Sequence, residues 1–390
     1  MIRGVVPHCC CWWLVRLLCV LGSAGLPAAD VPHQDRPRQW VRELAAPMFA
    51  VRQRATQHLI ECGVPALPAV EAGLRSRDRE VRLRCQRIRQ VIAENDFQAR
   101  LDRFATDAHS DRDYGLPKWK AFRGLVGDSA ASRQLFVEMQ REQGTFLDAL
   151  QRHPETAPQL IDAGVRILRG THVEHYRKPH SLATLATMLL LVLDRDITER
   201  SINEPLTLYL FRLDTSLRDS PVREPLIALL RRWLPRLEGP STYMAMHISL
   251  RHDIAEGRVL AERALRATTR PDDGLREPRN GRTYWRHLAV VMLARFGDER
   301  HVVLLTPLLD DSTPTPYARG HGTERDVTEI RDIALATLIT LRRRDLREFG
   351  FRNVRRDRAQ VWDLRTLAFA SDADRDRAIA AWRLLESKTP

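Results

Sequence analysis

Two sets of apolar residues repeat 30 positions apart, and this repeat constrains the fold more than any other feature of the chain. Within each set the residues are three or four positions apart, which places them on one face of a helix. The first set is Val51, Ala55, Leu59 and Cys62, and the second is Val81, Cys85, Ile88 and Ile92. Periods in this range are typical of stacked helix pairs that bury their apolar faces only against their neighbours. The pattern predicts an all-α fold, an α-solenoid or superhelix of stacked antiparallel helix pairs.

The residues between the two sets are those that end one helix and begin another. Gly63 follows the first set, where a left-handed residue commonly ends a helix. Pro65 or Pro68 then suits the first turn of a second helix. Asp78 lies in the turn before the next first helix. One complete helix–turn–helix unit is therefore predicted between residues 49 and 95.

This unit resembles a HEAT repeat, through the stretch from Gly63 to Val70 and the Asp78 and Val81-Arg82 that follow. The resemblance implies that Asp78 and Arg82 pair between neighbouring repeats. The whole chain also resembles uncharacterised secreted bacterial proteins with degenerate HEAT-like repeats. It shares with them phrases such as Trp40-Val41-Arg42-Glu43-Leu44 and Arg331-Asp332-Ile333-Ala334-Leu335. That likeness implies an exported helical scaffold and brings no known activity.

We predict one HEAT-like helical domain over residues 39–387, with little or no sheet. Regular repeats occupy 39–110, degenerate helical repeats that make the middle irregular occupy 111–260, and C-terminal repeats occupy 261–387. Long loops are expected at 268–283 and 310–328, and insertions of this kind often lie on a binding rim. The stretch from Leu182 to Leu193 is too short to span a bilayer, so we expect it to be a buried core helix.

The first 29 residues have the order of a secretory signal peptide: Arg3 and Arg16, then an apolar run, then small residues. We expect cleavage near Ala24 to Ala29, a linker over residues 30–38, and a secreted or periplasmic mature protein without an integral membrane span. An uncleaved anchor, and a misplaced start codon on a cytoplasmic chain, are the alternatives.

The composition excludes several classes of protein and favours the binding of acidic partners. At 390 residues, 44% apolar and 29% charged, the chain is neither a mini-protein, a collagen-like fibre nor wholly disordered. The net charge of +12 would attract acidic partners, although both signs are mixed along the helices. Only Cys62 and Cys85 follow the leader, which excludes a disulfide framework. The register of the repeat places these two cysteines too far apart for a bridge.

Four groups of side chains could carry chemistry, and for each we favour a structural role. The histidine group is His172, Glu174, His175 and His180, which could chelate a metal but suits a solvated loop. The carboxylate pairs Asp272-Asp273 and Asp310-Asp311 suit turns and caps. Ser249 lies near His247, His252 and Asp253 but lacks the nucleophile turn that a triad needs. The aromatic residues near basic ones are Tyr114, Trp119, Tyr284, Trp285 and Tyr317, which suit structural anchoring or partner contact.

The sequence thus predicts an exported, non-enzymatic helical-repeat scaffold, with no catalytic residue, cofactor or metal site. We expect a protein partner, with an acidic polymer and then nucleic acid as alternatives. The alternative function is a cytoplasmic HEAT-like nucleic-acid-binding protein or DNA glycosylase-type enzyme, which the positive charge favours and the leader opposes.

Overall fold

The computed structural model describes residues 35–107, 112–169, 181–268, 279–319 and 326–388. These residues form seventeen α-helices, and their only strands form two short antiparallel pairs. The first pair joins β1 (Pro314–Arg319) to β2 (Asp326–Glu329), and the second joins β3 (Arg356–Asp357) to β4 (Val361–Trp362). The predicted all-α class with little sheet is confirmed.

The chain divides into two compact units, residues 1–98 and residues 99–390. The boundary falls within the long helix α4 (Arg79–Thr106). The sequence predicted a single domain over 39–387, with its first internal boundary near residue 110. The predicted signal peptide, residues 1–29, and most of the predicted linker lie outside the described residues.

The first unit contains the predicted repeat. Its elements are α1 (Arg36–Glu43), α2 (Phe49–Cys62), the 3-10 turn η1 (Val64–Ala66), α3 (Leu67–Gly73) and the beginning of α4. Helix α1 packs on both α2 and α3. It begins at Arg36, so the last residues of the predicted linker are helical.

Six of the eight residues in the two periodic sets lie in the buried core of this unit. Ala55 and Leu59 of α2 are fully buried, as are Cys85 and Ile88 of α4. Helix α2 ends at Gly63, whose φ of +68° is in the region that favours glycine. The predicted helix face and its stop signal are therefore both present.

Helices α2 and α4 run in the same direction side by side. Arg84 near the start of α4 contacts the ring of Phe49 at the start of α2. Further along, Ile92 of α4 lines the same depression as Ile60 of α2. This arrangement is the one expected of equivalent helices in successive repeats.

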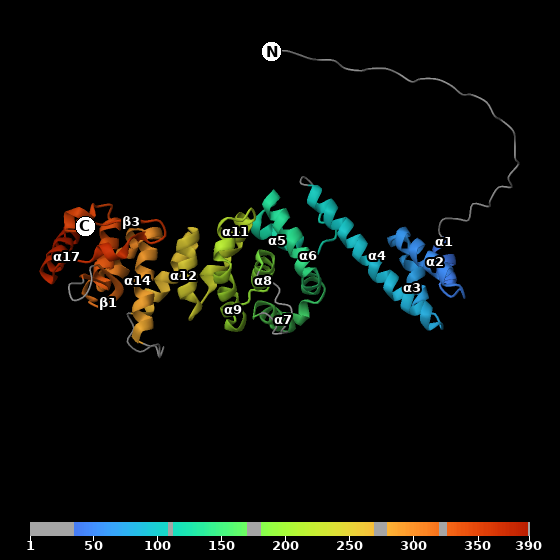
Figure 1. The fold of residues 1–390 in the computed structure, drawn as a ribbon. Coiled ribbons are helices and arrows are strands. Elements are labelled where there is room, and N and C mark those ends of the chain that lie inside the picture. The colour runs from blue at the N-terminus through green and yellow to red at the C-terminus, as the bar shows by residue number, and fades with distance from the viewer. Residues whose placement is uncertain (1–34, 108–111, 170–180, 269–278, 320–325, 389–390) are drawn as a thin grey trace, which may run out of the picture. The chain divides into compact units, whose positions relative to one another are not determined.

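The second unit is a succession of packed helices, whose order is visible in Figure 1. Its elements after α4 are α5 (Trp119–Val126), α6 (Ala130–Arg152), α7 (Ala157–Arg169), α8 (Leu182–Asp194), α9 (Arg200–Arg212), α10 (Asp214–Arg218), α11 (Arg223–Trp233), α12 (Ser241–His252), α13 (Arg258–Thr268), α14 (Arg279–Phe296), α15 (Val302–Leu305), α16 (Ile330–Leu341) and α17 (Asp372–Glu386). One row of contacts joins α6, α8 and α11, and another joins α7, α9, α12, α14 and α16 in turn. Two rows of helices, each packed on its nearest equivalents, make this unit solenoid-like.

Helix α8 fulfils the prediction of a buried core helix. Every residue from 183 to 192 is buried, and the helix packs on α6, α9 and α11. Among the described residues, none of the helices has both the length and the apolar character needed to cross a bilayer.

Two helices differ from their predicted bounds. Helix α6 continues past the expected end at Gln143, where the backbone kinks at φ −132° and ψ 21° and the helix resumes. Helix α9 begins before Pro205, which was expected to open it. Asn203 is buried there and its side-chain oxygen accepts a hydrogen bond of 2.8 Å from the indole N–H of Trp233. That contact holds the first turn in place although Pro205 lacks a backbone donor.

The predicted loop 310–328 contains strand β1 and most of β2. The hydroxyl of Thr315 donates to the carbonyl of Thr328 across the pair, at 2.6 Å. The hydroxyl of Thr328 in turn donates to the carbonyl of Leu364, at 2.8 Å. The segment is therefore folded against the chain that precedes α17. Of the other predicted loop, 268–283, residues 269–278 lie outside the described part, and α14 begins at Arg279.

Candidate binding surface

Ser249, His247 and His252 do not form a catalytic triad, and each has a structural role, as the sequence analysis favoured. The hydroxyl of Ser249 is fully buried and donates to the carbonyl of Ala245, at 2.7 Å. His247 bonds instead to the hydroxyl of Tyr243, at 2.6 Å, and His252 to Asp214, at 2.9 Å. Each of these side chains has a structural partner within or between helices.

The carboxylate pair at 310–311 serves in a turn, as predicted, and also forms ion pairs, which the sequence did not predict. Asp311 accepts a hydrogen bond from the backbone N–H of Thr313 at 3.1 Å and pairs with Arg286 at 2.7 Å. Asp310 pairs with Arg383 of α17, at 2.6 Å. The pair Asp272-Asp273 and the histidine group at 172–180 lie outside the described residues. Within the described residues, no three His, Cys, Asp or Glu side chains are grouped as metal ligands.

Cys62 and Cys85 are both free thiols, as the register of the repeat predicts. Cys62 is half-buried, and Cys85 is fully buried between α3 and α4. Burial raises the pKa of the Cys85 thiol to about 11, because the thiolate would lose its hydration. A thiol in this state is an unreactive core residue.

The aromatic candidates divide into core and surface residues. Trp119 is buried against the rings of Phe104 and Phe136, with centroids 4.8 and 5.0 Å away, so it anchors the fold. Trp285 is only half-buried and lies beside Tyr243, with centroids 6.3 Å apart. Tyr317 packs edge-on against His287, at 5.3 Å. Tyr114 packs edge-on against Phe104, and the side chain of Tyr284 is outside the described part.

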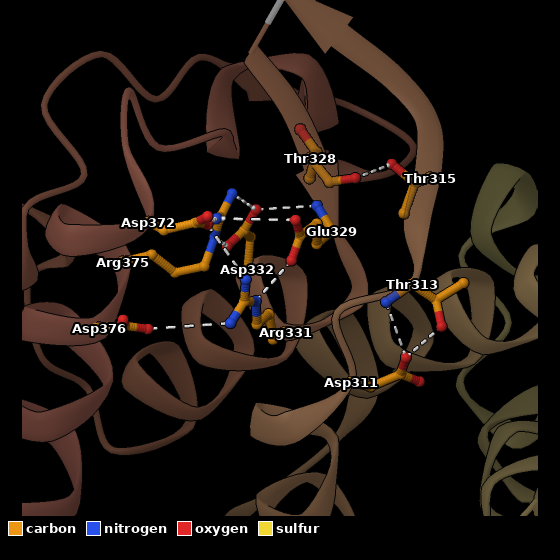
Figure 2. Close-up of polar contacts among 10 residues, drawn as sticks. All are labelled: Asp311, Thr313, Thr315, Thr328, Glu329, Arg331, Asp332, Asp372, Arg375 and Asp376. Atoms are coloured by element: carbon orange, nitrogen blue, oxygen red, sulfur yellow. Dashed lines mark hydrogen bonds and ion pairs between the residues drawn. The ribbon is translucent and has the colours of Figure 1, made fainter.

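The densest polar cluster joins the first turns of α16 and α17 (Figure 2). Asp332 is fully buried, accepts from the backbone N–H of Glu329 at 2.9 Å and pairs with Nε of Arg375 at 2.7 Å. Around this pair lie Glu329, Arg331, Asp372 and Asp376, each facing a charge of the opposite sign. Burial raises the pKa of Asp332, although the hydrogen bond and charge of Arg375 oppose this. Paired charges of this kind hold two helix ends together and leave the central carboxylate closed to a ligand.

Exposed apolar side chains gather on the first unit. Of the nine large apolar residues that are exposed in the described part of the chain, four belong to this smaller unit. They are Met48 at 66% exposure, Phe49 at 63%, Leu83 at 52% and Val64 at 49%. Periodicity did not single out Met48 and Phe49, because both precede the first buried position of α2.

Two arginines flank the exposed ring of Phe49. The guanidinium carbon of Arg52 lies 5.7 Å from the ring centroid, and that of Arg84 lies 5.9 Å away. Both distances are within the range of a cation–π interaction. We call Met48, Phe49, Arg52 and Arg84 the Phe49 surface.

A depression of about 510 Å³ lies at the other end of the same two helices. Its walls come from the end of α2, the cap residue Gly63, the start of η1 and the middle of α4; they are Gln57, Ile60, Glu61, Gly63, Val64, Ile92, Asn95 and Asp96. A Cβ added at Gly63 would meet no atom within 4 Å, so the space beside this glycine is open. The pair of helices therefore presents an aromatic and basic end and an acidic end.

In comparisons with known proteins, no family model, no curated protein and no solved structure matches this chain.

Proposed function

We propose that this protein is an exported, non-enzymatic helical-repeat scaffold that binds a partner protein through the Phe49 surface. The observation that carries the proposal is Phe49 itself, 63% exposed and flanked by two guanidinium groups. Aromatic residues, methionine and arginine are the types enriched where proteins bind each other.

The Phe49 surface is held in place before any partner binds. Arg52 donates to the backbone carbonyls of Ala46 and Pro47, both at 2.8 Å. Arg84 is oriented by an ion pair with Glu80, at 2.7 Å. Side chains that are already ordered lose less conformational entropy on binding. Their positive charge favours an acidic segment of the partner.

The same two helices support a HEAT-like family assignment. Helices α2 and α4 are equivalent in position, 30 residues apart, and α1 and α3 pack behind them. Repeat proteins of this type commonly present an extended face to a partner. An acidic polymer is the alternative ligand for the basic end of this face.

The proposal is tested by a pull-down with the full-length chain as bait. The chain is cross-linked chemically to its partners in the exported fraction of the producing cells, and the captured proteins are then identified. Phe49→Ala should release the captured partner, because it removes the exposed ring while leaving the buried core of α2 intact. Leu384→Ala is the matched control, since Leu384 is 58% exposed and belongs to the second unit. Capture of the same proteins by wild type and Phe49→Ala alike would contradict the Phe49 surface as the binding site.

Export is proposed from the leader of the sequence, and fractionation tests it. We expect the mature chain to lack about the first 29 residues and to leave the cytoplasm. A full-mass chain that remains in the cytoplasm would contradict export and favour nucleic acid as the partner. Duplex DNA binding that weakens steeply with salt would then be the expected signature.

A further inference from the structure

Two arginines bind one buried carboxylate in the second unit, and a third arginine binds the backbone of the histidine that contacts the same carboxylate. Arg251 of α12 donates to Oδ2 of Asp214, and Arg218 of α10 lies 3.9 Å from the same oxygen. Arg223, at the start of α11, donates to the backbone carbonyl of His252, at 3.2 Å. The ring of His252 binds the other oxygen of Asp214, at 2.9 Å.

This cluster has more positive than negative charge. Among the described residues, only Asp214 and Glu224 form ion pairs with these three guanidinium groups. The carboxylate of Asp214 is buried and balances one positive charge. The side chain of Glu224, which pairs with Arg223, is 74% exposed. Displacing Glu224 into solvent would leave two positive charges without a counter-ion.

The buried histidine is consistent with this excess. The pKa of His252 is lowered chiefly by burial, and further by the charges of Arg223 and Arg218, against the opposing hydrogen bond and charge of Asp214. A neutral imidazole is what an already positive environment favours.

The three guanidinium groups also remain accessible. The side chains of Arg218, Arg251 and Arg223 are 55%, 42% and 31% exposed. Arg218 is too far from Asp214 for a hydrogen bond, so its planar donor face is available to a ligand. Guanidinium groups in this number match the oxygens of a phosphate group, to which they bind in pairs of parallel hydrogen bonds.

We propose that Arg218, Arg223 and Arg251 form a binding site for a phosphate group. With Glu224 displaced by the ligand, the two positive charges that remain match a phosphate dianion, and Asp214 and His252 position the arginines from the buried side. The site belongs to the second unit and involves no residue of the Phe49 surface, so it goes beyond the proposed protein-binding function. The phosphate group is either a free ion or part of a chain of phosphates.

The test is direct titration of the full chain with inorganic phosphate and with tripolyphosphate, by calorimetry and by thermal unfolding. Sodium chloride at matched ionic strength provides the reference. We expect saturable binding and a rise in Tm that chloride does not reproduce. Tighter binding of tripolyphosphate than of phosphate identifies a chain of phosphates as the ligand, and equal binding identifies the free ion.

Arg218→Gln should weaken the binding about tenfold, because it removes a charge-assisted hydrogen-bond donor at little cost to the fold. Arg344→Gln is the matched control, since Arg344 is 49% exposed and pairs with Glu348 four residues away. Phe49→Ala should bind phosphate as wild type does, which separates a failure here from a failure of the proposed function. An equal response of wild type, Arg218→Gln and Arg344→Gln would overturn the proposal, and so would the lack of saturable binding.

Discussion

Arg52 and Arg82 make the same pair of hydrogen bonds 30 residues apart. Nη1 of Arg52 donates to the carbonyls of Ala46 and Pro47, and Nη1 of Arg82 donates to those of Ser76 and Arg77. Each arginine thus lies in the first turns of its helix and satisfies two carbonyls of the turn before it. The 30-residue period of the sequence is therefore also a period of the hydrogen bonds.

Replacing Arg82 by alanine should destabilise the first turn of α4. Two carbonyls would lose a charged donor, and we expect a loss of about 1–2 kcal/mol in the local stability of α4. Hydrogen exchange of the amides at residues 80–86 measures this loss. Arg89→Ala, at another exposed position of α4, should change the same amides by less than about 0.5 kcal/mol. Equal protection in the two variants would contradict the structural role of Arg82.

The role of Arg82 could only partly be predicted from the sequence. The resemblance to HEAT repeats implied that Asp78 and Arg82 pair between neighbouring repeats. In the structure, Arg82 instead donates to two backbone carbonyls, and Asp78 accepts a hydrogen bond of 2.8 Å from the backbone N–H of Glu80. Helix faces are predictable because burial imposes the period of the helix on the apolar residues. The partner of a long polar side chain depends on local backbone geometry, on which that period carries no information.

Long-range contacts explain the remaining differences. The first turn of α9 lies ahead of Pro205, and Trp233, 30 residues away, donates a hydrogen bond to Asn203 in that turn. Trp119, by contrast, has the anchoring role that was favoured for it, because the rings of Phe104 and Phe136 bury it. The Phe49 surface could not be found by periodicity, since its exposure depends on how α2 and α4 pack together. Composition indicated basic binding regions without placing the arginines around Asp214.

Gly73 should not tolerate alanine. An added Cβ would overlap the sulfur of Cys85 and would approach Val41 of α1 to 3.0 Å. Because the site is closed by three helices, we expect Gly73→Ala to cost about 1–3 kcal/mol of unfolding free energy in the first unit. Chemical denaturation followed by hydrogen exchange in α3 measures the loss.

Two further variants test the cause of that loss. Adding Cys85→Ala to Gly73→Ala should restore part of the stability, because the overlapping sulfur is removed. Gly124→Ala, in α5, should instead be neutral or stabilising by up to about 1 kcal/mol, since its added Cβ meets no atom within 4 Å. If the double variant is no better than Gly73→Ala alone, the contact with Cys85 is not the cause.

The buried pair of Asp332 and Arg375 should respond differently to single and double substitution. Asp332→Ala leaves the guanidinium of Arg375, itself 5% exposed, without its buried partner, and should cost about 3–5 kcal/mol. Replacing both residues together, as Asp332→Leu with Arg375→Met, should recover most of this loss, because neither desolvated charge remains. Thermal unfolding of the two variants gives the comparison, and a double variant as unstable as the single one would show that the ion pair itself stabilises the junction of α16 and α17.

Acidification should destabilise the second unit through His247 and His252. Burial lowers the pKa of both residues below the ordinary value of 6.5. In the unfolded chain these histidines bind protons near pH 6.5, whereas in the folded chain they do so only at lower pH. Their contribution to stability is therefore complete above pH 6.5 and is lost as the pH falls through the interval below it.

The slope of Tm against pH isolates this contribution for His252. Between pH 7.5 and pH 5, the Tm of wild type should fall more steeply than that of His252→Gln, which lacks one of the two titrating rings. The absolute Tm of the variant is expected to be lower at every pH, because Asp214 loses the partner that binds it at 2.9 Å. His58→Gln is the control, since His58 is exposed on α2 and belongs to the first unit. Parallel slopes for wild type and His252→Gln would show that His252 does not couple protonation to unfolding.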